Sequence, residues 1–240
     1  MATHGGPNIV DDGLVFYVDP ANKDSWDGPD ASLVNNLVST NTGSIVNDTS
    51  GSYGDNNSFA FDGTDDYIDC CNIFSALDGL QKMTLSIWVK PTSPNTSRHI
   101  ISIPWDTGYP NRNVFRLTIR NTNLLWFTVG TDSFRATETT QTLVFNQWNY
   151  IAAVVDTTQA QQVDRIKIYN NATFSKGSDN MNLNLTFNTS IGGIFIGENG
   201  SRSNYLSNFQ GDMSCIMVYN RALSSQEVKQ NFNALNRFGI

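Results

Sequence analysis

Four aspartates could supply oxygen ligands to a cation. Asp62, Asp65 and Asp66 fall within five residues, in a turn between two short apolar runs, and Asp19 closes the first predicted strand. Calcium prefers several oxygen ligands, and carboxylates in aspartate-rich turns provide them. The alternative is that these residues form the turn itself, with carboxylates that accept hydrogen bonds from nearby backbone N–H groups. The sequence favours the turn, predicts no required cofactor, and leaves calcium as the one candidate.

A second group of side chains could bind a saccharide. Arg116, Arg120 and Trp126 are predicted to project from the same outward face of a hairpin. Aromatic rings can stack on sugars, and arginine donates to hydroxyls or to acidic groups. The alternative is that these side chains pack on neighbouring loops or subunits, and the sequence does not separate the two. Loop residues that could form the rim of this groove are Trp105, Arg112 and Tyr205, and a further strand could add Arg165, Lys167 and Tyr169.

The acidic residues argue against glycoside hydrolysis. Retaining glycosidases need two carboxyl groups about 5–5.5 Å apart. The glutamates Glu138, Glu198 and Glu227 are widely separated, and no strand carries a pair of acids. Glu138 is predicted to lie in a threonine-rich turn, and Glu227 is explained by a helix cap. We therefore expect a protein that is not an enzyme.

Histidines and cysteines give no sign of nucleophilic or zinc chemistry. His4 lies near the N-terminus and His99 follows a Pro-Asn-Ser stretch, so both are expected to be exposed loop residues. The three cysteines, Cys70, Cys71 and Cys215, have no regular spacing that would indicate a disulfide framework or a zinc site. They are expected to be small buried apolar residues.

Composition limits the class of protein. The net charge of −7 disfavours nonspecific binding to nucleic acid or to an anionic membrane. The N-terminus lacks the basic and apolar pattern of a secretory signal, and no apolar run is long enough to span a membrane. We expect the chain to fold in a cytoplasm. Its 240 residues suit an N-terminal arm, residues 1–12, followed by one large domain, residues 13–240.

Alternating apolar residues predict an all-β fold. Residues 83–90, 114–120 and 124–129 alternate clearly, whereas residues 148–156 are apolar on both faces and predict a central strand. Residues 21–57 read as loop. Near the C-terminus, Ser224 and Glu227 have the spacing of a capping box at the start of a helix. We predict a jelly-roll sandwich of two antiparallel sheets with wet outer faces and one short C-terminal helix.

Several sequence blocks, taken in order, resemble a known superfamily. They include Gly13-Leu14-Val15-Phe16-Tyr17-Val18-Asp19, residues 59–68, 85–91 and 147–152, and Tyr219-Asn220-Arg221-Ala222-Leu223-Ser224. Together they resemble the laminin-G-like, concanavalin A-like lectin/glucanase superfamily over residues 13–235. This resemblance implies a concanavalin A-like sandwich, a fold shared by lectins, adhesion modules, glycanases and coat proteins. It also implies that a glucanase would carry a Glu-x-Asp-x-x-Glu strand, which this sequence lacks.

The opening of the chain and residues 232–240 resemble versions found in structural proteins of tailed bacteriophages, including cyanophages. That resemblance implies a non-enzymatic virion protein, and first of all a capsid decoration protein. Such a protein would fold in the host cytoplasm and then lie on the virion surface. Expected partners are other virion proteins of capsid or tail, further copies of the chain, and host surface polysaccharide, but neither nucleic acid nor membrane. The alternative is a carbohydrate-binding adhesin of a tail fibre or host-recognition complex.

Overall fold

The computed structural model describes most of the 240 residues. The described ranges are residues 8–28, 31–40, 42–46, 53–54, 58–70, 74–92, 97–104, 113–129, 135–177, 187, 193–198 and 207–240.

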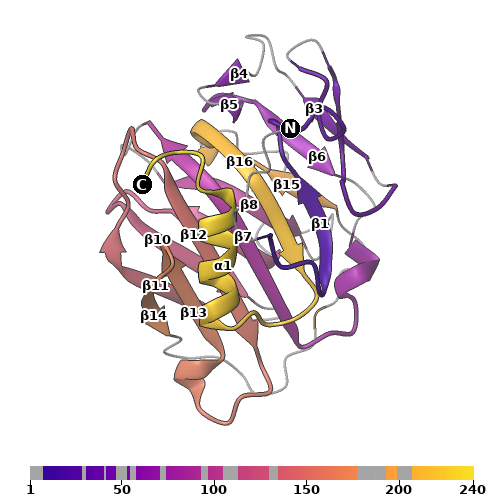
Figure 1. The fold of residues 1–240 in the computed structure, drawn as a ribbon. Coiled ribbons are helices and arrows are strands. Elements are labelled where there is room, and N and C mark those ends of the chain that lie inside the picture. The colour runs from indigo at the N-terminus through magenta and orange to yellow at the C-terminus, as the bar shows by residue number, and fades with distance from the viewer. Residues whose placement is uncertain are drawn as a thin grey trace.

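The described strands form two antiparallel sheets, which we call sheet A and sheet B (Figure 1). Sheet A contains, in spatial order, β14 (Thr173–Gly177), β13 (Ile166–Asn170), β12 (Asn149–Asp156), β7 (Lys82–Pro91), β16 (Gln210–Tyr219), β5 (Ser58–Asp62) and β4 (Tyr53–Gly54), and β1 (Leu14–Val18) also pairs with β16. Sheet B contains β11 (Arg135–Thr142), β10 (Leu124–Val129), β9 (Asn113–Ile119), β8 (Arg98–Pro104), β15 (Ile194–Ile196), β6 (Tyr67–Cys70), β3 (Thr42–Val46) and β2 (Leu33–Asn35). The described residues also form three short helical elements, namely the single-turn helices η1 (Phe74–Leu77) and η2 (Gln162–Asp164) and the α-helix α1 (Ser225–Leu235).

The main core lies between the two sheets. Residues that alternate along β7, namely Met83, Leu85 and Ile87, belong to the same buried cluster as Leu125 and Phe127 of β10. Because successive side chains of a strand point to opposite faces, each sheet presents its apolar residues to the other. This arrangement confirms the predicted sandwich of two antiparallel sheets.

The outer face of sheet A is covered by the C-terminal helix. In Figure 1, α1 runs across the front of β12, β7 and β16. Beneath it lies a second buried cluster, in which the ring of Phe232 stacks on Trp88 with centroids 5.6 Å apart and Phe238 stacks on Trp148 at 4.0 Å. All eight residues of β12 are buried in consequence. The prediction of β12 as a central strand is confirmed, whereas the predicted wet outer face is wrong for sheet A.

A buried ring of hydrogen bonds ties the N-terminal segment to this layer. The backbone N–H of Val10 donates to Asn231 Oδ1 at 2.8 Å, and Asn231 Nδ2 donates to the hydroxyl of Tyr219 at 2.9 Å. The Tyr219 hydroxyl donates in turn to the carbonyl of Val10 at 2.9 Å. Each of these buried polar groups is thereby satisfied, which removes the penalty of burying it.

The helix begins as the sequence predicts. Ser224 Oγ accepts from the N–H of Glu227, and the Glu227 carboxylate accepts from the N–H of Ser224 at 2.8 Å. The same carboxylate lies 2.7 Å from Arg221 Nη2. These partners provide hydrogen-bond acceptors for backbone N–H groups at the start of the helix and hold this end against the sheet.

Some strands were not predicted from the sequence. β2 and β3 lie within residues 21–57, which were expected to be loop, and β11 contains Glu138, which was expected in a turn. Both β2 and β11 are end strands of sheet B, where pairing depends on backbone hydrogen bonds along one side. Such strands need no apolar alternation, so their sequences resemble loops.

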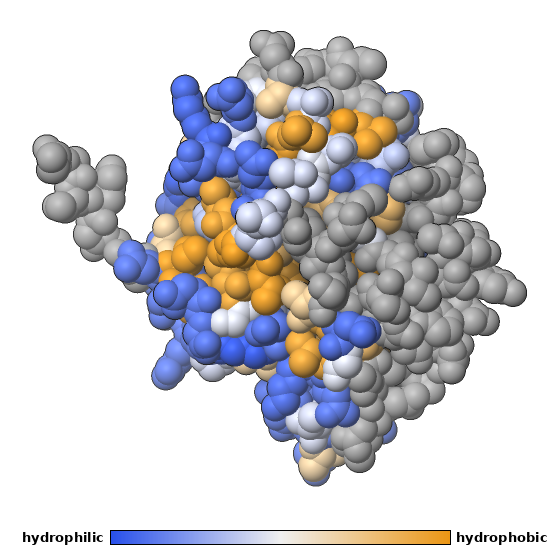
Figure 2. Space-filling model, turned by 90° about the vertical axis from the view of Figure 1, so that its right-hand side faces the viewer, coloured by the Kyte–Doolittle hydropathy of each residue, from blue (hydrophilic) through white to orange (hydrophobic). Residues whose placement is uncertain are grey.

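None of the helices in the described parts of the chain combines the length and the hydrophobicity needed to span a bilayer. At the surface, Figure 2 shows the side of the molecule that carries β1, β3 and β6, where apolar residues gather at the centre with hydrophilic ones around them. The two cysteines that the structure describes, Cys70 and Cys215, are buried, as predicted.

We predict that truncating Phe232 to alanine lowers the free energy of unfolding by about 2–3 kcal/mol, because its ring packs on Trp88 and Tyr150. Urea denaturation followed by tryptophan fluorescence would measure this loss. Asn233→Ala is the matched control, since Asn233 is exposed on the same helix. Equal and small losses for the two variants would show that the helix is not needed to cover sheet A.

Candidate functional site

The outer face of sheet B carries two cross-strand rows of mainly polar side chains. Strand pairing aligns residues on neighbouring strands, and directly paired residues point to the same side of the sheet. The first row consists of Asn208, His99, Thr118, Trp126 and Glu138. The second row consists of Asp69, Phe195, Ser102, Arg116 and Thr128.

Trp126 and two arginines form a group on this face, on strands β9 and β10 beside the edge strand β11. The guanidinium carbon of Arg120 lies 4.7 Å from the centroid of the Trp126 ring, and that of Arg116 lies 5.7 Å from it. Both distances fall within the range of a cation–π contact. Arg120 also faces Glu138, with Nε and Oε1 3.5 Å apart, and both of these side chains are about 40 % exposed. The structure therefore brings Arg116, Arg120 and Trp126 together on one face, as their spacing predicts.

His99 lies beside this group and is buried. Only 7 % of the residue is exposed, and its Nδ1 lies 3.0 Å from the Thr118 hydroxyl. Burial, with a smaller effect from the Arg116 charge, lowers the pKa of His99 to about 3, so the imidazole is neutral near pH 7. The expectation of an exposed loop histidine is wrong, because residues 98–104 form β8. The isoleucines that follow His99 were the sequence signal for this strand.

Two further polar side chains on this face lack hydrogen-bond partners. Arg116 is half-buried, burial lowers its pKa, and its Nε is buried without an acceptor. Asn208 is 1 % exposed, and neither atom of its side-chain amide forms a hydrogen bond. Buried polar groups without partners are uncommon in native proteins. Nothing in the sequence singled out Asn208, since an asparagine is ordinary in a chain so rich in this residue.

The other predicted saccharide residues are not part of the described face. Trp105, Arg112 and Tyr205 lie outside the residues that the structure describes. Three further candidates, Arg165, Lys167 and Tyr169, were expected to extend the surface around Trp126. That expectation is wrong, because residues 165–169 lie in or beside β13, which belongs to sheet A.

The aspartate-rich turn brings three of its four predicted ligands together. One carboxylate oxygen from each of Asp62, Asp65 and Asp66 lies within 4.8 Å of the others. Two of these carboxylates also accept backbone hydrogen bonds, from Thr64 N–H to Asp62 at 2.6 Å and from Asp62 N–H to Asp66 at 2.9 Å. The oxygen donors suit calcium, yet the carboxylates of Asp62 and Asp66 also hold the turn. Calcium binding therefore stays the alternative to the turn-forming role that the sequence favours.

Asp19 does not belong to this group of three. Its two carboxylate oxygens accept from the Arg237 guanidinium at 2.7 and 3.0 Å. Arg237 also donates to the hydroxyl of Ser214 at 2.5 Å. A two-point contact between arginine and carboxylate is among the stronger ion pairs in proteins. Asp19 therefore anchors the segment that follows α1 to β1 and β16.

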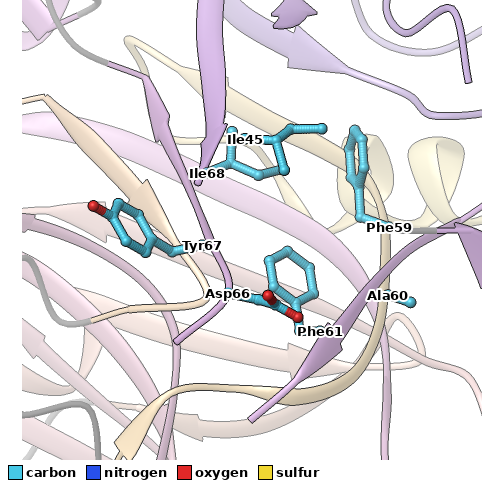
Figure 3. A pocket seen from close by; sticks show the side chains of 7 residues that line it. All are labelled: Ile45, Phe59, Ala60, Phe61, Asp66, Tyr67 and Ile68. Carbon is cyan, nitrogen blue, oxygen red and sulfur yellow. The ribbon is translucent and has the colours of Figure 1, made fainter. Parts of the chain in front are cut away.

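A small hollow lies next to the aspartate-rich turn (Figure 3). Its volume is about 10 Å³, and apart from Asp66 its lining comes from Ile45, Phe59, Ala60, Phe61, Tyr67 and Ile68. These residues belong to β3, β5 and β6, so the hollow opens between the two sheets. It is smaller than the usual range for ligand pockets and offers few polar groups. The outer face of sheet B is the better candidate for binding a polar ligand.

The chain belongs to the concanavalin A-like lectin/glucanases superfamily, whose family model matches residues 62–229. This match confirms the resemblance to the superfamily and agrees with the observed sandwich. No curated protein matches the chain in sequence.

Several solved structures share the fold. A sialidase from Trypanosoma rangeli in complex with an inhibitor is similar with a TM-score of 0.70 and 14 % identity, covering 97 % of this chain and 34 % of its own. Domain 4 of an extracellular arabinanase from Geobacillus stearothermophilus, in complex with arabinotriose, has a TM-score of 0.62 and 18 % identity, covering 92 % of this chain and 98 % of its own. A pentraxin from Limulus polyphemus has a TM-score of 0.51 and 18 % identity, covering 64 % of this chain and 70 % of its own. The chain thus spans about a third of the length of the sialidase it matches.

These relatives overturn one expectation. The sequence led us to expect a phage capsid decoration protein, or a tail-fibre adhesin as the alternative, and this assignment is wrong. The similar structures are sialidases and a domain of an arabinanase bound to a saccharide, and none of those described above is a virion protein. Location on a virion stays a prediction that neither the fold nor these relatives test.

We predict that acid weakens the fold through His99. The unfolded chain binds a proton near pH 6.5, whereas folded His99 does so only near pH 3, so stability is lost as the pH falls through this window. Between pH 6.5 and 4.5 the loss reaches up to about 2 kcal/mol, from about 1.4 kcal/mol per pH unit.

Urea denaturation at a series of pH values would measure this loss. His99→Gln should flatten the dependence between pH 6.5 and 4.5, whereas His4→Gln, which removes the other histidine, should leave it unchanged. A wild-type profile that is flat in this window would contradict a buried neutral His99.

A second prediction concerns the aspartate-rich turn. Since its carboxylates accept backbone hydrogen bonds, we expect the same Tm in calcium and in EDTA, measured by scanning calorimetry. Asp66→Ala should lower Tm equally in both, because the Asp62 N–H loses its acceptor. A rise in Tm with calcium that Asp65→Ala abolishes would establish a metal site instead.

Proposed function

We propose that this chain is a glycan-binding module that holds a saccharide on the outer face of sheet B and does not hydrolyse it. The observation that carries this proposal is the grouping of Trp126 with Arg116 and Arg120 on that face. An indole ring offers apolar area for the C–H face of a sugar, and the guanidinium groups donate to its hydroxyls.

The distribution of polar residues supports the choice of face. The outer face of sheet A is apolar and lies beneath α1, so it presents little surface to a polar ligand. The outer face of sheet B instead carries His99, Ser102, Thr118 and Thr128, all of them buried polar residues, next to the half-exposed arginine and tryptophan side chains. Ligand sites combine apolar area with a few fixed polar groups, and this face offers both.

One structural relative gives further support. The arabinanase domain from Geobacillus stearothermophilus that shares this fold was solved in complex with arabinotriose, and nearly the whole of each chain is covered in the comparison. The same fold can thus bind a saccharide as a separate domain of a larger enzyme.

The positions of the glutamates favour binding over hydrolysis. Glu138 lies on β11, and Glu198 follows β15, which is separated from β11 by β8, β9 and β10. Four inter-strand steps of about 4.8 Å place the two backbones about 19 Å apart. Paired catalytic carboxyls lie about 5–9.5 Å apart, well below this separation. The third glutamate, Glu227, serves the cap of α1.

We predict that Trp126→Ala weakens saccharide binding about tenfold or more, because an aromatic contact contributes about 0.5–1.5 kcal/mol beyond its buried area. A glycan array would first identify a ligand, and isothermal titration calorimetry would then compare the variants. Phe174→Ala is the matched control, since Phe174 is an exposed aromatic residue on β14 of sheet A. No binding across the array, or equal losses in the two variants, would contradict the proposed function.

A further inference from the structure

Arg116 differs from Arg98, Arg120, Arg165, Arg221 and Arg237 in having no hydrogen-bond acceptor among the described residues. Arg98 donates to the carbonyls of Gly63 and Asn208, and Arg165 donates to two carbonyls. The others face carboxylates, namely Glu138 for Arg120, Asp12 and Glu227 for Arg221, and Asp19 for Arg237. No hydrogen bond or ion pair joins the Arg116 guanidinium to any described side chain or carbonyl.

The surroundings of Arg116 also disfavour an uncompensated charge. The residue is half-buried, and burial alone lowers the pKa of its guanidinium. A desolvated cation is costly unless an opposite charge lies beside it. Its neighbours across the strands are Ser102 and Thr128, which carry no charge, and His99 is held neutral nearby.

Acidic residues of the face do not form an ion pair with Arg116. Asp69 stands in the same row but on β6, three strands away from β9. Glu138 is engaged with Arg120. Glu198 meets the row through its main-chain carbonyl, which accepts from Ser102 Oγ at 2.8 Å, and no salt bridge joins its carboxylate to Arg116. Although the chain has a net charge of −7, none of these acidic groups pairs with the half-buried Arg116. Its guanidinium can therefore bind an anionic group of a ligand.

We propose that the saccharide bound on this face carries a carboxylate, which Arg116 binds while the sugar ring packs against Trp126. This inference rests on the proposed glycan-binding function and specifies its ligand class. The planar guanidinium matches a carboxylate with two parallel hydrogen bonds, a geometry that a neutral hydroxyl does not provide. Arg120 has room to adjust, since its contact with Glu138 is an exposed pair of small energy.

The test compares one sugar in charged and uncharged form. Oligogalacturonate and its fully methyl-esterified form differ in the carboxylate charge and keep the same sugar backbone. Calorimetry at pH 7 should show tenfold to hundredfold tighter binding of the acid, because a hydrogen bond to a charged group is stronger than a neutral one. This preference should shrink in high salt, since the site is only half-buried.

Variants assign the preference to Arg116. Arg116→Gln should abolish the preference for the acid and leave the weaker binding of the ester. Arg116→Lys should retain part of the preference, because lysine keeps the positive charge but lacks the planar guanidinium. Lys229→Gln changes the net charge by the same amount on exposed helix α1 and should have no effect. Circular dichroism and Tm would verify that each variant folds.

The outcomes separate this inference from the proposed function. If the acid and the ester bind equally well and Trp126→Ala abolishes both, the proposed carboxylate contact is contradicted, whereas the glycan-binding function is supported. A preference for sulfated over unsulfated sugars, without one for acid over ester, would also overturn the carboxylate. Absence of binding to every saccharide on a glycan array would contradict the proposed function itself.

Discussion

The aromatic layer between α1 and sheet A is the contact on which the rest of the molecule depends. Sheet A is apolar on both faces, and its outer face needs a cover as much as its inner face needs sheet B. Phe232 and Phe238 supply the cover by stacking on Trp88 and Trp148. The ring of hydrogen bonds through Asn231 and the ion pair between Arg237 and Asp19 hold the two ends of the described chain in place around it. Each tie joins segments more than 200 residues apart in sequence, or α1 to β16, so the cover depends on contacts between distant parts of the chain.

This cover determines which surface is free to act. With the outer face of sheet A covered by α1, the half-buried side chains of Arg116, Arg120 and Trp126 on the outer face of sheet B remain for a ligand, beside buried polar groups. The rows of this face combine a tryptophan, arginines and buried hydroxyl groups, which suits a ligand with both apolar and hydroxylated surfaces. Arg116 adds a cation that the described chain does not neutralise. The proposed function gives the two sheets different roles, because sheet A supports the fold while sheet B carries Arg116, Arg120 and Trp126 at its surface.

Much of this arrangement was predicted from the sequence. The hairpin of β9 and β10, the apolar strand β12 and the capping box at Ser224 all follow from local patterns, and so does the common face of Arg116, Arg120 and Trp126. Other features depend on contacts distant in sequence. β11 is rich in threonine and pairs at an edge, so it reads as a turn, and His99 reads as a loop residue although its strand is buried by pairing with β9 and β15. The engagement of Asp19 by Arg237 joins opposite ends of the described chain, and no local pattern indicates it.

The most direct test of the account locates the ligand among the tryptophans. The chain has five, and their indole N–H groups give separate signals in a two-dimensional NMR spectrum of the nitrogen-labelled protein. Titration with a bound saccharide should shift the Trp126 signal, while those of Trp88 and Trp148, beneath the helix cover, stay in place. Shifts at Trp88 or Trp148 with an unchanged Trp126 would place the ligand on the other sheet and contradict the account.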